Sequence, residues 1–182
     1  MHDDVLLSPR FSAKWVEQQL REYDALLMKV WDLDPVRDSW WVWTNHSSGY
    51  PGVEKVASHF DQRALASNWK QRTGTELSVG ERALAFWGEM DLSVLRTSLI
   101  RAMVDDLRCL QGVWTEVAMP TAILHHTANV GISGGLALWG DDRVKSFDEL
   151  LALAAEHPFV HPLKVSELDP ADAKRRYEAL RA

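Results

Sequence analysis

RALAFWGEMDLSVLRTSLIRAMVDDLRCLQGVWTEVAMP, residues 82–120, is the part of the chain on which the predicted fold depends. It holds short runs rich in Leu, Ile, Val, Trp and Thr, which are separated by GEMD and DDLRCLQG and end at Pro120. Runs of this kind between turn-forming segments are typical of strands. We therefore predict a central antiparallel sheet with strands at Arg82–Trp87, Thr97–Val104 and Val113–Met119. Leu99–Leu110 fits a helix as well, and its periodicity does not decide between the two.

The residues that precede this stretch predict a strand, a long helix and a second strand. Val5–Leu7 is a candidate first strand, and Ser12 is a candidate N-cap. Apolar residues at spacings of three and four continue the helix up to Asp34-Pro35, namely Val16, Leu20, Tyr23, Leu27, Val30 and Trp31. The residue before a proline disfavours helical backbone, so we expect the helix to end there. A strand at Ser39–Thr44 follows it.

A second helical pattern covers Val53–Arg72. Asp61 is a candidate cap of a second short helix within it, and Gly74 occupies the place of a C-terminal glycine.

The residues after the predicted sheet point to further strands and two helices. Ile123–Trp139 predicts one or two strands. Ser146 and Glu149 form a capping box for a helix that ends before Pro158, and Asp169-Pro170 begins the last helix. Helices, a central sheet and then helices predict an α+β fold, which we expect to form a single domain over residues 1–182.

The charge balance restricts the partners. The chain of 182 residues carries 26 acidic and 20 basic residues, a net charge of −6, and its pI is near 5.6. A nucleic-acid binder needs a basic face, so we expect no nucleic-acid partner. Cys109 is the only cysteine, which excludes an internal disulfide and favours a reducing compartment. The N-terminal MHDDVLLSPR lacks the basic and apolar regions of a secretory signal, and no segment approaches the ~20 apolar residues of a membrane span. We expect a cytoplasmic protein without a membrane partner.

DSWWVWTNHSSGYPG, residues 38–52, places three tryptophans within four positions. In a strand, Trp40 and Val42 share one face while Trp41 and Trp43 share the other. The second face is covered either by a neighbouring element of the fold or by a partner, since Trp is frequent at binding hot spots.

A short internal similarity adds acidic residues. LAFWGEMD at 84–91 resembles LALWGDDR at 136–143. Either both are similar strand ends, or Trp87 and Trp139 line one edge together. The second alternative gives that edge an acidic rim of Glu89, Asp91, Asp141 and Asp142.

GISGG, residues 131–135, fits the G-x-S-x-G pattern of serine hydrolases, and Ser133, Asp148 and His157 or His161 follow in the required order. A nucleophile elbow needs a helix after the serine, whereas Leu136–Gly140 reads as a strand. We expect no enzymatic activity and keep a Ser133 hydrolase as an alternative.

The candidate metal ligands are His125, His126, His157, His161 and Cys109, and no pair of them has the spacing of a structural zinc site. His125 and His126 would point to opposite faces of a strand. We therefore expect no metal and no cofactor, and no loss of folding on chelation.

The order of several landmarks resembles the immunity protein 52 family of bacterial toxin-immunity systems. An early strand ends in arginine, a helix leads to Leu-Asp-Pro and a Trp-rich strand, and Leu-x-x-Trp-Gly and Met-Pro strands follow. The matching stretches are LLSPR (6–10), WDLDPVRDSWW (31–41), LAFWGEMD (84–91) and VWTEVAMP (113–120). The resemblance implies that the chain neutralises a cognate toxin, in particular a nuclease delivered by a secretion system such as type VI.

An acidic chain with surplus tryptophan suits this function, because nuclease toxins have basic clefts and charge complementarity steers association. We expect the toxin to contact Asp38, Trp41, Trp43, Glu89, Asp91, Asp141 and Asp142. A chaperone or scaffold of a secretion apparatus would use the same features, and a second copy of the chain is an alternative partner.

Overall fold

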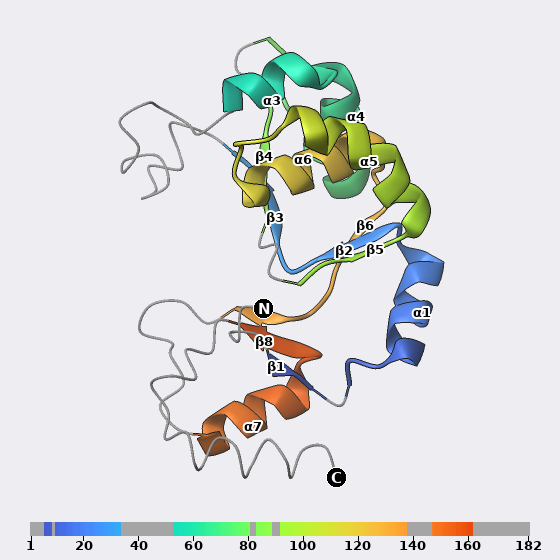
Figure 1. Cartoon of the computed structure of the whole chain (residues 1–182), viewed down its shortest axis with the longest axis vertical. Helices are drawn as coiled ribbons and strands as arrows, with labels where there is room; N and C mark the ends of the chain where they lie inside the picture. Colours follow the sequence, from blue (N-terminus) through green and yellow to red (C-terminus); the bar gives the residue numbers. More distant parts are fainter. Residues whose placement is uncertain are drawn as a thin grey trace. The chain divides into compact units, whose positions relative to one another are not determined.

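The computed structural model describes residues 6–8, 10–33, 53–80, 83–88, 92–137 and 147–161, which combine helices with short strands (Figure 1). This arrangement confirms the α+β class. The chain divides into two compact units, one of Leu20–Ile132 and one of Met1–Gln19 together with Ser133–Ala182. The single domain over residues 1–182 stays a prediction, and each unit is described by itself.

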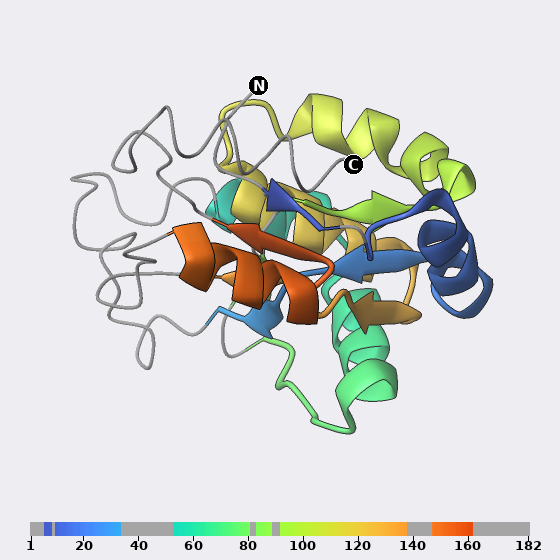
Figure 2. The same cartoon turned by 90° about the horizontal axis from the view of Figure 1, so that it is seen from below.

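The larger unit contains two small sheets. Strand β2 (Ala25–Leu27) lies between β5 (Val94–Leu95), which runs antiparallel to it, and β6 (Val130–Ile132), which runs parallel. Both views show β5 beside β2 (Figure 2). Strands β3 (Val30–Asp32) and β4 (Phe86–Gly88) form a separate antiparallel pair. The three-stranded sheet around β2 is thus mixed, and the prediction of one antiparallel central sheet is wrong in this respect.

Among the described residues of this unit, three helices pack against a fourth, central one (Figure 1). Helix α6 (Thr115–His126) packs against α3 (Val53–His59), α4 (Gln62–Thr73), α5 (Thr97–Cys109) and strand β4. Its buried residues are Val117, Ala118, Pro120, Thr121, Ala122, Ile123 and Leu124.

The strand predicted at Val113–Met119 is wrong, because these residues lead into and form part of α6. A helix that is covered on nearly every side has no polar stripe, so its sequence shows no helical period. The first residues of the Ile123–Trp139 run belong to α6, and the prediction that the run holds one or two strands is confirmed. Farther along the predicted Ile123–Trp139 segment, β6 and β7 (Leu136–Ala137) are strands.

The strand predicted at Thr97–Val104 is also wrong, and the alternative helix over Leu99–Leu110 is confirmed in large part by α5. Leu99 and Met103 are buried one turn apart on this helix, and Leu110 is buried directly after it. Ile100 and Val104 remain exposed. The helix therefore buries one stripe, which is typical of an amphipathic helix.

The long helix predicted from Ser12 up to Asp34-Pro35 ends early. Helix α1 covers Ala13–Glu22, and Ser12 Oγ accepts a hydrogen bond from the Trp15 N–H at 3.2 Å, as expected of an N-cap. Ala25–Leu27 becomes a fully buried strand with a neighbour on each side. Leu27 thus lies in β2, and Val30 and Trp31 lie in β3, although their spacing continues the helical pattern. Burial in the tertiary structure outweighs the local preference here.

Two other predicted helix ends are confirmed. Asp61 accepts a hydrogen bond from the Arg63 N–H at 2.9 Å as the N-cap of α4, and Gly74 ends that helix with a φ of 77°. A left-handed backbone of this kind favours glycine.

Among its described residues, the smaller unit holds a three-stranded sheet, one whole helix and the first residues of α1. Strand β8 (Phe159–His161) pairs antiparallel with β1 (Leu6–Leu7) and parallel with β7. Helix α7 (Phe147–Glu156) ends before Pro158, as predicted. Phe159 is fully buried, and its ring and that of Phe11 pack in a T-shaped arrangement.

Trp87 lies in the core of the larger unit. It is 5% exposed, and its ring centroid lies 6.3 Å from that of Trp31 and 6.1 Å from that of Trp114. Trp87 is therefore a core residue and does not line an exposed edge. Trp139, its predicted companion at that edge, lies outside the described residues. Among the described residues, none of the helices has the length and apolar character needed to cross a membrane.

Candidate functional site

The interface predicted from the sequence lies outside the described residues. This applies to all seven of its members, namely Asp38, Trp41, Trp43, Glu89, Asp91, Asp141 and Asp142. Their contact with a partner stays a prediction. The segments Ser39–Thr44 and Asp169-Pro170 and the capping residue Ser146 also lie outside the described part of the chain.

The structure instead brings together four polar side chains from the ends of three helices. His59 is the last residue of α3, Asp106 lies in the last turn of α5, and His125 and His126 end α6. All of them belong to the unit formed by Leu20–Ile132. We call these four residues the histidine–aspartate cluster.

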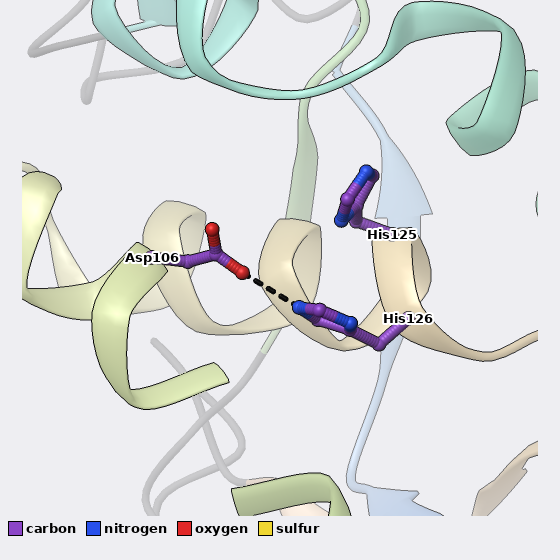
Figure 3. A group of neighbouring side chains, drawn as sticks. All are labelled: Asp106, His125 and His126. Atoms are coloured by element: carbon purple, nitrogen blue, oxygen red, sulfur yellow. Dashed lines mark hydrogen bonds and ion pairs between the residues drawn. The ribbon is translucent and has the colours of Figure 1, made fainter. Parts of the chain in front are cut away.

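Asp106 is the centre of the cluster. His59 Nε2 lies 2.7 Å from Asp106 Oδ1, and His126 Nε2 lies 2.6 Å from Asp106 Oδ2. Figure 3 shows the second of these interactions between α5 and α6. The Asp106 side chain is 20% exposed, so water competes with both contacts only in part. One carboxylate thus joins three helices through hydrogen bonds that gain strength from its charge.

The pKa of Asp106 is lowered from its usual value. Burial alone would raise the pKa, but the hydrogen bonds from His126 and His59, and the attraction of these rings when charged, together outweigh it. The group therefore stays a carboxylate at neutral pH and can accept hydrogen bonds or bind a cation.

His125 has a different environment from His126. Its Nδ1 is buried and has no hydrogen-bond partner among the described residues. Its ring packs 4.8 Å from Phe60 and 5.0 Å from the ring of His126. Burial lowers the pKa of His125, and repulsion from His126 adds to this effect while Asp106 opposes it. A neutral imidazole with a free ring nitrogen is the form in which histidine binds metals.

Sequence reasoning found two members of this cluster and missed the others. The sequence predicts that His125 and His126 point to opposite faces of a strand, whereas they lie in a helix, where successive residues are separated by about 100°. Asp106 and His59 belong to no metal-ligand pattern in the sequence. The missed signal is the stripe Leu99, Met103, Asp106 and Leu110, which places a carboxylate at an inward position of α5.

The other candidate metal ligands lie elsewhere. Cys109 is exposed at the end of α5. His157 belongs to the smaller unit, where its Nδ1 lies 3.0 Å from the carbonyl oxygen of Gly134. The side chain of His161 is outside the described part of the structure.

The G-x-S-x-G segment comprises the end of β6 and the residues that connect it to β7. Ser133 is 7% exposed, and its Oγ accepts a hydrogen bond from the Gly135 N–H at 3.3 Å. Strand β7 follows Gly135, as the sequence predicted, and not the helix that a nucleophile elbow requires.

The comparisons with known proteins identify no relative. No family model matches the chain, and no curated protein or solved structure matches it either. The resemblance to the immunity protein 52 family therefore stays a prediction.

Proposed function

We propose that this chain is a non-enzymatic, cytoplasmic binding protein that neutralises a cognate protein toxin, in particular a nuclease. The observation that carries the proposal is the charge balance, a net −6 from 26 acidic and 20 basic residues. A nuclease needs a basic cleft for its phosphate substrate, and an acidic protein gains steered association with such a surface.

The distribution of tryptophan supports a binding surface at residues 40–43. Trp31, Trp87 and Trp114 pack together, and Trp69 packs on Phe86 in the core. These four account for part of the nine tryptophans in the chain. Three further tryptophans, Trp40, Trp41 and Trp43, lie within four positions of the sequence. Tryptophan is enriched among the residues that carry binding energy at interfaces.

The proposal is tested first through the neighbouring gene. A reading frame beside the gene for this chain should encode a protein that ends in a toxin domain. Expression of that domain alone should stop bacterial growth, and co-expression of this chain should restore growth while both proteins purify together. The control is a toxin from an unrelated system, which this chain should neither bind nor neutralise. Continued toxicity despite soluble, folded chain would contradict the proposal.

A further inference from the structure

We propose that Asp106, His125 and His126 bind a divalent transition-metal ion, with zinc as the ion that suits the ligands best. One ligand atom from each side chain lies within 4.8 Å of the other two (Figure 3). Zinc ligands at about 2.0–2.1 Å in a tetrahedral site lie roughly 3.3 Å apart. Side-chain rotations that close the widest pair by about 1.5 Å therefore complete the site. This inference is independent of toxin binding.

A second observation supports a ligand at this position. His125 keeps a buried Nδ1 without a hydrogen-bond partner among the described residues. A buried polar atom normally has a hydrogen-bond partner or a bound ion beside it. An ion bound at the cluster would be such a partner for His125 Nδ1. The neighbouring Asp106 carries the negative charge that a cation requires.

The donor set decides the class of ion. Two imidazole nitrogens and one carboxylate oxygen suit zinc and its neighbours copper, nickel and cobalt, whereas calcium and magnesium prefer sets of oxygen ligands. Three protein ligands leave one tetrahedral position for water, as in open zinc sites. The three side chains come from α5 and α6, so the ion would join these two helices.

His59 is a positioning residue in this arrangement. It contacts Asp106 Oδ1, whereas His126 contacts Oδ2. An ion that binds Oδ2 and the His126 nitrogen would replace the contact between them, and the hydrogen bond from His59 to Oδ1 would remain. Partners of this kind orient the ligating carboxylate and raise metal affinity.

Isothermal titration calorimetry, in which zinc chloride is added to the metal-free full chain, tests the site. The experiment uses a Cys109→Ser background, because Cys109 is exposed and its thiol could bind zinc independently. We expect one zinc ion per chain. Asp106→Asn, His125→Gln and His126→Gln should each lower the affinity at least tenfold, and circular dichroism should confirm that each variant is folded.

Two matched variants serve as controls. Asp105→Asn removes the adjacent carboxylate of the same helix, whose side chain is 91% exposed, and His157→Gln removes a histidine from the other unit. Both should bind zinc as the parent does. His59→Gln should weaken binding about tenfold with unchanged stoichiometry, and it should alter the visible spectrum of bound cobalt. The absence of zinc binding in the parent, or equal losses in Asp105→Asn and Asp106→Asn, would overturn the proposal.

X-ray absorption spectroscopy of the zinc-loaded natural chain tests the ligand set without any variant. Two imidazoles and only nitrogen or oxygen in the first shell are the expected result. A sulfur ligand would assign the ion to Cys109 and refute the proposed site, and a shell with fewer than two imidazoles would refute it as well.

Discussion

Thr121 binds both backbone groups of Phe86. Its Oγ1 accepts a hydrogen bond from the Phe86 N–H at 2.9 Å and donates one to the Phe86 carbonyl oxygen at 3.3 Å. Both residues are fully buried. The Thr121 side chain on α6 thus forms the hydrogen bonds with β4 that a neighbouring strand would otherwise form. This contact joins the central helix to the sheet.

Thr121→Val should test this contact, because it keeps the shape of the side chain and removes the hydroxyl. We expect the free energy of unfolding to fall by about 1–3 kcal/mol, since the buried Phe86 N–H loses its partner. Urea denaturation measures the change. Thr121→Ser, which keeps the hydroxyl, is the control and should retain more stability than the valine variant. Equal stabilities for the valine variant and the natural chain would refute the prediction.

Gly135→Ala should destabilise the smaller unit through a steric clash. A Cβ at this position would lie 2.3 Å from ring atoms of Phe159, whose side chain is fully buried. We expect a loss of about 1–3 kcal/mol or more, because the packed ring has little room to move. Gly134→Ala is the comparison, since that position has a φ of 73° and no atom within 4 Å of an added Cβ. Its loss should be about 1–2 kcal/mol from the backbone alone. Thermal unfolding that ranks Gly134→Ala as the more damaging variant would contradict the steric explanation.

Arg96→Met should weaken the end of α1. The Arg96 side chain donates hydrogen bonds to the carbonyl oxygens of Leu20 and Tyr23 and forms an ion pair of 3.2 Å with Asp24. Methionine keeps the apolar stem but offers no donor. We expect a loss of about 1 kcal/mol in chemical denaturation, since the guanidinium is partly exposed and water replaces some contacts. Arg96→Lys should recover only part of this loss, because lysine cannot reach several carbonyls with a planar fork. If the lysine variant recovered the full stability, the positive charge alone, and not the planar fork, would account for the contribution of Arg96.

Neutralising the acidic rim together with Asp38 should slow association with the toxin. The variant replaces Asp38, Glu89, Asp91, Asp141 and Asp142 by their amides, and its association rate should also depend less on salt. A control with the same net charge replaces the exposed acids Glu17, Glu22, Glu76, Asp105 and Glu156 instead. Equal association rates for the two variants would show that net charge, rather than the predicted rim, steers the encounter.

Trp41→Ala and Trp43→Ala should mainly speed dissociation of the toxin complex. A loss of about 2 kcal/mol, roughly 30-fold in affinity, is expected of a hot-spot residue. Each variant must first be shown to be folded, because a core Trp→Ala costs about 3–5 kcal/mol of stability and would imitate the result. Folded variants that bind as the natural chain does would place these tryptophans outside the interface.

Capping residues in the sequence predicted several helix ends correctly. The elements that the sequence did not predict are those whose structure depends on burial against distant parts of the chain. Ser12, Asp61 and Gly74 act through contacts within their own turns, so neighbouring residues suffice to predict them. Helix α6 is surrounded by other elements, and its apolar sequence resembles a buried strand. The antiparallel expectation failed because β2 pairs in parallel with β6, and helices α3, α4, α5 and α6 lie between these two strands in the sequence.

The histidine–aspartate cluster could be predicted only after α5 and α6 were recognised as helices. Asp106 and His126 are separated by 20 residues, and their contact depends on how the two helices pack. Spacing rules for zinc sites search for ligands that are close in sequence. The pair His125-His126 was visible in the sequence, but its partner on another helix was not.

The central claim is that this chain neutralises a toxin by binding it, and an inhibition titration tests the claim most directly. Purified chain is added to a fixed concentration of the nuclease encoded by the neighbouring gene, and cleavage of a nucleic-acid substrate is measured. We predict a linear loss of activity that is complete at one equivalent of chain. Full nuclease activity in the presence of excess folded chain would contradict the account.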